Sequence, residues 1–166
     1  VIESPTGSGK TTQLPLILRE DGYDKRGIIG ITQPRRIATL SVTEFIKKQI
    51  DDKGPYAAYK MRFADTSTPE TRIKVMTDGI LLQEVKADPL LSKYSVIMVD
   101  EAHERSLNID FILGLLKEII SKRSDLKIVV SSATINTKVF SSFFFDAPII
   151  SINAKTFPIA VNYMPL

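Results

Sequence analysis

The stretch that decides the fold is Ser4-Pro5-Thr6-Gly7-Ser8-Gly9-Lys10-Thr11. It fits the phosphate-binding pattern G-x-x-x-x-G-K-[ST], except that a serine takes the place of the first glycine. Gly7 and Gly9 let the backbone curl so that successive N–H groups point at phosphate oxygens, and a helix beginning near Lys10 adds its positive end. We therefore expect a nucleotide-binding loop made of Thr6, Gly7, Ser8, Gly9, Lys10, Thr11 and Thr12.

Two residues of this loop have side chains suited to ATP. Lys10 is placed to bridge the β- and γ-phosphates, and the hydroxyl of Thr11 to bind Mg²⁺. The alternative is a chance glycine-rich turn. The order of apolar strand, loop, Lys-Thr pair and helix favours the phosphate-binding interpretation.

A second stretch, Tyr94-Ser95-Val96-Ile97-Met98-Val99-Asp100-Glu101-Ala102-His103, brings two carboxylates to the end of an apolar strand. We expect Asp100 to hold Mg²⁺ through water, and Glu101 to orient and deprotonate the attacking water. Adjacent carboxylates can also form a helix N-cap, but their pairing with the phosphate-binding loop favours a catalytic role.

His103 is the only histidine of the chain, and there is no cysteine. A zinc site is not expected, because zinc takes several His or Cys ligands. A lone histidine is usually structural. Its position directly after the carboxylates favours a place in the catalytic set, with Lys10, Asp100 and Glu101, and a role in coupling ATP to the next motif.

The composition sets wide bounds on function. The chain has 166 residues and a net charge of +3, which permits contact with nucleic acid without arguing for it. Without cysteine there are no disulfides or thiolate metal sites. No apolar run is long enough for a membrane span, so no membrane partner is expected. We expect an intracellular protein, cytoplasmic, or nuclear if the source is eukaryotic.

Apolar strands alternate with helical stretches. The predicted strands are residues 1–3, 28–32, 96–99 and 126–131, with weaker candidates at 57–63 and 72–76. The predicted helices are residues 11–19, 36–50, 109–120 and 138–145, with Pro15 an objection to the first. The alternation predicts an α/β fold, in which a mainly parallel sheet has helices on both faces. We expect one domain over residues 1–166, cut at both ends.

Asp100-Glu101-Ala102-His103 is the name-giving motif of the DEAH-box RNA helicases, and the chain resembles that family from end to end. Each further segment is weak alone, but their order and spacing are specific. These segments are Thr32-Gln33-Pro34-Arg35-Arg36-Ile37-Ala38, Met61-Arg62-Phe63, Thr77-Asp78-Gly79-Ile80-Leu81-Leu82-Gln83-Glu84, His103-Glu104-Arg105-Ser106, Ser132-Ala133-Thr134 and Thr156-Phe157-Pro158. The resemblance implies the first RecA-like P-loop NTPase domain of an RNA helicase, which binds and hydrolyses ATP with Mg²⁺ to move on single-stranded RNA.

The resemblance also assigns roles to individual residues. The RNA backbone would be held by Pro34, Arg35, Arg36, Arg62, Thr77 and Asp78. Ser132 and Thr134 would couple the nucleotide state to the grip on RNA. Without the resemblance, the arginines read as ordinary surface residues. Because Thr6, Arg35, Asp100 and Thr134 follow predicted strands, we expect them along one edge of the sheet.

The family's reaction needs a second RecA-like domain, which supplies arginine fingers. We find no such set after Thr134 and expect an incomplete site, with the other domain of the same protein, and an activator protein, as further partners. Alone, the chain is expected to hydrolyse ATP slowly and to unwind nothing.

Four positions depart from the family's pattern. Ser4 replaces a glycine, and Gln83 stands where arginine is common. Phe45 falls where the family often has an arginine that stacks on the nucleotide base; it is a candidate for stacking or for the core. Residues 153–155 replace a usual Gly-Arg pair.

Two other functions stay open. A nucleotide-binding scaffold without turnover draws support from Ser4, whereas intact Lys10, Asp100 and Glu101 argue against it. A motor on DNA is the second alternative, because a grip on the backbone need not distinguish sugars.

Overall fold

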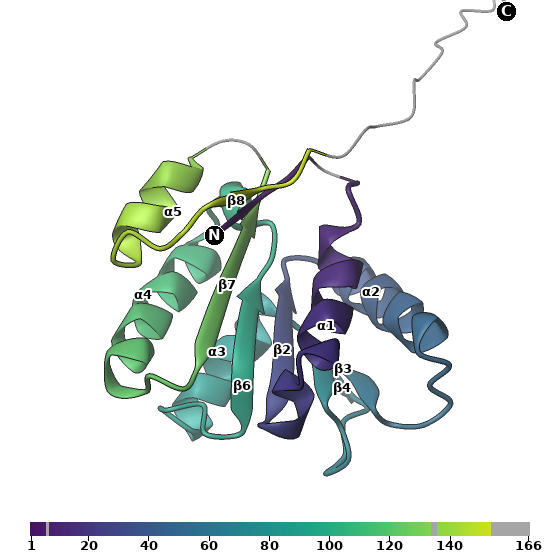
Figure 1. Cartoon of the computed structure of the whole chain (residues 1–166). Coiled ribbons are helices and arrows are strands. Elements are labelled where there is room, and N and C mark those ends of the chain that lie inside the picture. The colour runs from purple at the N-terminus through teal and green to yellow at the C-terminus, as the bar shows by residue number, and fades with distance from the viewer. Residues whose placement is uncertain (6, 134–135, 154–166) are drawn as a thin grey trace, which may run out of the picture.

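The apolar segments rich in Ile and Val form the centre of a parallel sheet in a computed structural model of the chain (Figure 1). The structure describes residues 1–5, 7–133 and 136–153. The strands are β1 (Ile2–Glu3), β2 (Ile28–Gln33), β3 (Ala57–Met61), β4 (Ala64–Asp65), β5 (Ile73–Thr77), β6 (Tyr94–Val99), β7 (Lys127–Ser132) and β8 (Ile150–Ser151). Their order in the sheet is β4-β3-β5-β2-β6-β7-β1-β8, and only the β3–β4 pair is antiparallel.

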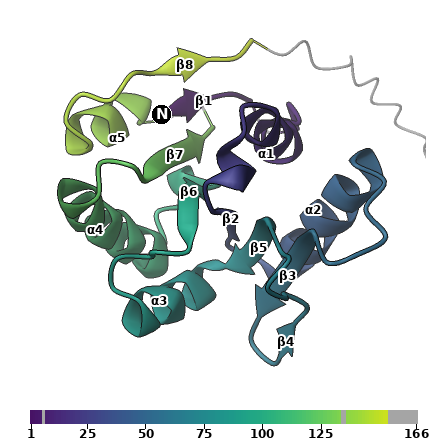
Figure 2. The same ribbon diagram turned by 60° about the horizontal axis from the view of Figure 1, so that its bottom comes forward.

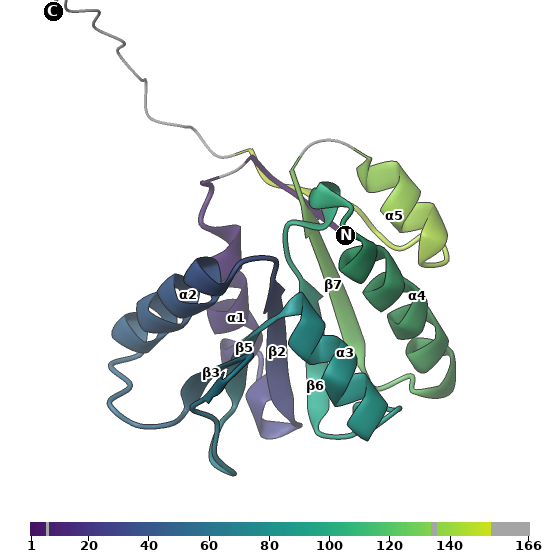
Figure 3. The ribbon, with the colours of Figure 1, turned by 180° about the vertical axis from the view of Figure 1, so that it is seen from behind.

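Helices cover both faces of this sheet, as Figures 1 and 3 show from opposite sides. The helices are α1 (Lys10–Glu20), α2 (Arg36–Gln49), α3 (Asp78–Ala87), α4 (Leu107–Lys122) and α5 (Thr137–Phe143), with single 3₁₀ turns η1 (Tyr23–Lys25) and η2 (Ala102–Glu104). Ile29, Ile31 and Val75 lie in the core beneath α1 and α2, while Met76 and Ile97 lie in the core beneath α3, α4 and α5. The predicted α/β fold with a mainly parallel sheet is confirmed.

The strands at the centre of the sheet read as continuous apolar runs because both of their faces are covered. All six residues of β6 are buried, and so are five of the six in β2. The α4 helix instead buries residues at helical spacing, such as Ile109, Ile112, Leu113 and Leu116. None of the helices in the described ranges combines the length and the apolar character that crossing a membrane requires.

Two expectations about local structure were incomplete. The predicted strand at 57–63 ends at Met61, because the backbone reverses at Phe63, whose φ is 68°, and returns as β4. The α3 helix was not assigned. It is short, and only Asp78, Ile80 and Leu81 are buried, so its apolar spacing is weak.

Arg123 ties the end of α4 to the turn before β6. Its guanidinium donates to the carbonyl oxygens of Leu90 (2.9 Å), Leu91 (2.6 Å) and Tyr94 (3.0 Å), and it pairs with Asp125 at 2.7 Å. The side chain is only 14% exposed. Each of these carbonyls would lose one hydrogen bond if the guanidinium were removed, although the Leu91 carbonyl would keep one from the Tyr94 backbone N–H at 2.9 Å.

We expect Arg123→Ala to lower the free energy of unfolding by about 1–3 kcal/mol, because three carbonyl groups each lose a hydrogen bond from the guanidinium. Urea unfolding followed by circular dichroism measures the change. The neighbouring Lys122→Ala is the control: Lys122 makes one exposed ion pair with Glu118, and its loss should cost at most about 1 kcal/mol. Equal losses in the two variants would contradict the role given to Arg123.

Candidate functional site

The carboxyl ends of the central parallel strands meet along one edge of the sheet, at the upper end in Figure 1. The register pairs Thr32 with Val99, and Gln33 with Thr77. The residues after β2, β5 and β6 are therefore neighbours, as expected for a ligand-binding edge of an open α/β sheet.

The phosphate-binding loop lies at this edge, before α1. Gly7 and Gly9 both have φ of 80°, where a side chain would be strained, and α1 begins at Lys10. The Lys10 Nζ atom is buried and donates to the backbone oxygen of Ser4 at 3.2 Å. Thr6 lies outside the described residues. The hydroxyl of Thr12 donates to the Gly9 carbonyl at 3.0 Å, so it bonds within its own helix.

Ser4 fits the loop without a glycine's conformation. It is fully buried and is absent from the residues with positive φ. Its hydroxyl donates to the hydroxyl of Ser8 across the loop. Serine at this position therefore adds a hydrogen bond inside the loop instead of breaking it.

Asp100 links this loop to the rest of the edge. Its Oδ2 accepts a hydrogen bond from Thr11 Oγ1 at 2.5 Å and one from Gln33 Nε2 at 2.7 Å. Its Oδ1 is buried and has no hydrogen-bond partner among the described residues. An unpartnered carboxylate oxygen beside a hydroxyl matches what Mg²⁺ takes from proteins, which is one or two oxygen ligands, with waters and substrate phosphates for the rest. Thr11 and Asp100 thus fit this ion.

Glu101 and His103 form a second pair beside Asp100. Burial, reinforced by the charge of Asp100, raises the pKa of the Glu101 carboxyl. His103 Nδ1 accepts a hydrogen bond from the Ala133 backbone N–H at 3.0 Å, and its Nε2 lies 3.1 Å from Glu101 Oε2. The proton of the neutral imidazole is then on Nε2, facing Glu101. His103 therefore joins Glu101 to the segment after β7.

The two residues predicted to couple the sites are Ser132, the last residue of β7, and Thr134. Ser132 is buried, and its hydroxyl donates to the Ala133 carbonyl at 2.8 Å. Thr134 lies outside the described residues, so the prediction for it stays a prediction.

The predicted RNA-binding residues share a cavity. All six line one cavity of about 500 Å³: Pro34, Arg35, Arg36, Arg62, Thr77 and Asp78. They come from the ends of β2, β3 and β5 and the start of α3. Arg35 is 76% exposed on its side chain and pairs with Glu104 at 3.3 Å. Arg62 lies over the ring of the exposed Phe63, 4.9 Å from its centroid. We call this cavity the arginine cavity.

Several residues of the site were not identified from the sequence. Gln33 was not predicted to have a role of its own, although its side chain donates a hydrogen bond to Asp100. Glu104, Ser106 and Asn108 line the arginine cavity, and so does Gln83. The sequence did contain one signal for Gln33, because it is a polar residue at the end of an otherwise apolar strand. The open question about Phe45 is answered in part, because its exposure of 41% places it outside the core.

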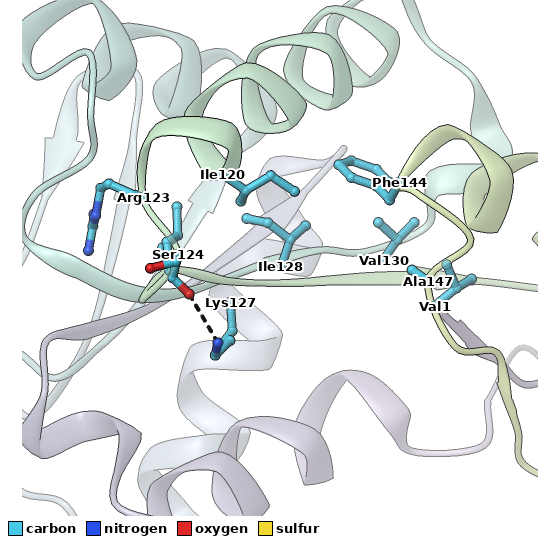
Figure 4. A pocket seen from close by; sticks show the side chains of 10 residues that line it. Val1, Ile120, Arg123, Ser124, Lys127, Ile128, Val130, Phe144 and Ala147 are labelled. Carbon is cyan, nitrogen blue, oxygen red and sulfur yellow. Dashed lines mark hydrogen bonds between the residues drawn. The ribbon is translucent and has the colours of Figure 1, made fainter.

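A separate cavity lies away from all these residues. Its volume is about 290 Å³, and it opens between α4 and β7 (Figure 4). Ile120, Ile128, Val130 and Phe144 gather around it. No predicted site residue lines it, and its polar residues Arg123 and Lys127 hydrogen-bond to backbone oxygens of the protein, so we assign it no part in the site.

Asp78 is an unusual carboxyl in the arginine cavity. It is buried at the first position of α3, and its Oδ1 has no hydrogen-bond partner in the described part of the chain. Burial, together with the charges of Glu104 and Asp100, raises its pKa from 3.8 to about 6. The protonated carboxyl therefore stabilises the fold fully below pH 3.8, and this contribution is lost as the pH rises through about 6.

We expect Asp78→Asn to raise the free energy of unfolding above pH 6 by up to about 3 kcal/mol, because asparagine resembles the neutral carboxyl. The gain should shrink as the pH falls towards 4. Urea unfolding of both proteins across this range measures it. Asp88→Asn is the control and should show no gain, because hydrogen bonds from Ser92 lower the pKa of Asp88. A gain that did not change with pH would contradict the assignment.

The sequence was compared with known proteins. Residues 1–142 match the model of a family described as DEAD/DEAH box helicase. The chain is 60% identical over 166 residues to a protein of Borreliella burgdorferi named ATP-dependent RNA helicase HrpA, a match that covers 99% of this chain and 20% of that relative. It is 50% identical over 167 residues to the Escherichia coli protein of the same name, covering 100% of this chain and 13% of the relative.

A third relative comes from Haemophilus influenzae and is named ATP-dependent RNA helicase HrpA homolog. It is 49% identical to this chain over 168 residues, and the match covers 100% of this chain and 13% of the relative. The chain thus spans a fifth or less of the length of these curated relatives. The family match covers most of the chain and includes the phosphate-binding loop and both carboxylates. The chain therefore belongs to the DEAD/DEAH box helicase family.

Proposed function

We propose that this chain is the ATP-binding motor domain of an RNA helicase, which hydrolyses ATP to move on single-stranded RNA. The observation that carries the proposal is the contact between Thr11 and Asp100, which lie 89 positions apart in sequence. It joins the phosphate-binding loop to the carboxylate pair in one site. The three relatives are each named as ATP-dependent RNA helicases or a homolog of one, which supports the same activity for the full-length protein.

The residues divide the work on ATP. The backbone N–H groups around Gly7 and Gly9, with the start of α1, would hold the phosphates, and Lys10 would exchange its bond to the Ser4 carbonyl for one to a phosphate oxygen. Thr11 and Asp100 would hold Mg²⁺, which neutralises phosphate charge when bound. Glu101, with its raised pKa, would accept a proton from the attacking water, and His103 would keep its carboxylate oriented.

The arginine cavity would hold the RNA backbone. Its arginines supply charges for phosphates, which position a strand without reading its sequence. The Arg35–Glu104 ion pair is exposed and therefore weak, so a phosphate can replace Glu104 as the partner of Arg35. A second RecA-like domain of the full-length protein would complete the ATP site from the open edge and supply the arginine fingers.

We expect Glu101→Gln in the full-length protein to lower the RNA-stimulated rate of ATP hydrolysis by about 100-fold or more, with ATP still bound, because it removes the base and keeps the shape. Phosphate release and nucleotide binding are measured on the same preparation. Glu118→Gln, an exposed position on α4, is the matched control. Unchanged hydrolysis in Glu101→Gln would favour a scaffold without turnover.

Gln33 is expected to act as a positioning residue for Asp100. Gln33→Ala should weaken the Mg²⁺-dependent part of ADP binding by about 10–100-fold, because partners of a metal ligand have effects of that size. Binding measured in EDTA should change little. Gln49→Ala, at the exposed end of α2, is the control. Equal losses with and without Mg²⁺ would show a structural role alone.

A further inference from the structure

A second polar cavity lies where β2, β5 and β6 begin, at the opposite edge of the sheet from the ATP site, and it extends to Glu84 of α3. Its volume is about 680 Å³, and its lining residues come from the turn before β2, β3, the loop between β4 and β5, β5, α3 and the turn before β6. Figure 2 turns the lower end of the sheet in Figure 1 toward the reader, with β3, β4, β5 and α3 in view. Six cationic residues line it, and we call it the lysine cavity: Lys25, Arg26, Lys60, Arg72, Lys74 and Lys93.

The two carboxylates that line the lysine cavity are already engaged. Glu84 accepts hydrogen bonds from Lys60 Nζ at 2.8 Å and from the Tyr94 hydroxyl at 2.9 Å, and it lies 3.7 Å from Lys74 Nζ. Asp24 accepts one from the Tyr56 hydroxyl at 2.6 Å. Glu84 thus pairs with Lys60 and Lys74, whereas Asp24 has none of the six cations as an ion-pair partner among the described residues.

Four of the six cations that line the lysine cavity have no carboxylate partner among the described residues. Lys25, Arg26, Arg72 and Lys93 make no ion pair within 4.0 Å in the ranges that the structure describes. Two of them are nevertheless held in place. Arg72 Nη1 donates to the carbonyl oxygens of Pro69 and Thr71, both at 3.1 Å, and Arg26 stacks over Tyr23 at 5.0 Å from the ring centroid. Fixed, unpaired cations around a cavity suit an anion with several charges.

The lysine cavity adjoins the arginine cavity. On α3, Gln83 lines the arginine cavity and Glu84 lines the lysine cavity. At the end of β3, Arg62 lines the arginine cavity and Lys60 lines the lysine cavity. Along β5, Thr77 in one cavity and Lys74 in the other are three positions apart, a distance of about 10 Å at the rise of a strand.

We propose that the lysine cavity binds the sugar–phosphate backbone of the same RNA strand, beyond the nucleotides held in the arginine cavity. This inference rests on the proposed function. A single-stranded RNA is the ligand that best fits, because the two cavities have neighbouring lining residues on α3 and β3 and a long polyanion can occupy both together. Grooves that track a nucleic-acid backbone with positive charge behave in this way.

The test uses the full-length protein and fluorescence anisotropy with two labelled oligouridines. The short strand is the shortest oligouridine whose binding is weakened by Arg35→Gln. The long strand extends beyond it at both ends. The long strand should bind more tightly. The double variant Lys25→Gln and Lys93→Gln should lose this gain and leave the short strand unaffected. It should also reduce the slope of log K against log salt for the long strand by about 1.4, the value for two phosphate contacts on a single strand.

The matched control is Lys48→Gln with Lys127→Gln, two exposed lysines that line neither cavity. The control should keep both the gain and the salt slope. Equal binding of the two strands, or an equal loss in both double variants, would overturn the inference. So would unchanged binding of the long strand in the cavity variant, the result expected if an acidic polypeptide segment occupies the lysine cavity.

The same data separate this inference from the proposed function. Arg35→Gln should weaken both strands and reduce RNA stimulation of ATP hydrolysis. If no oligouridine of any length depended on Arg35 for binding, the function proposed for the arginine cavity would fail. If binding of the short strand depended on Arg35, but the tighter binding of the long strand did not depend on Lys25 and Lys93, only the proposal for the lysine cavity would be wrong.

Discussion

The hydrogen bonds to the Asp100 carboxylate are the constraint on which the ATP site depends. Thr11, at the start of α1, and Gln33, at the end of β2, both donate to one oxygen of a buried side chain. A buried carboxylate without donors costs several kcal/mol, so these contacts serve the fold and the site together. The parallel register of β2 and β6 is what places Gln33 beside Asp100.

Local patterns were enough to predict most of the fold. Buried parallel strands are continuous apolar runs, and helices on a sheet repeat their apolar residues at helical spacing, so a short window of sequence contains the signal. The elements that were missed carry little of it. The strands β4 and β8 have two residues each, and α3 buries few side chains. Their existence depends on neighbours that are distant in the sequence.

The candidate site, like the fold, contains residues that could be predicted from local sequence and residues that could not. Residues that end a strand within a recognisable motif, such as Arg35 and Thr77, were predicted, and they meet because parallel strands end at one edge. Gln33 and Glu104 were not, because their roles depend on which side chains lie opposite them, and that is set by strand register and by the turn after β6. Motif resemblance supplied the residues expected to bind RNA, and charge alone would have left the arginines among them as ordinary surface residues.

The short turn η2 connects the two halves of the site. Glu101 and Arg105 flank it, with φ of 53° and 46°, a left-handed conformation that is unfavourable for residues other than glycine. The buried Ala102 fixes the turn against the core. From this turn, His103 reaches the backbone after β7 and Glu104 reaches Arg35 in the arginine cavity. Such strain persists only where the surroundings impose it, and here the hydrogen bonds on either side do so. Because Glu101, His103 and Glu104 belong to one short turn, we expect a shift of the Glu101 backbone to move His103 and Glu104 as well.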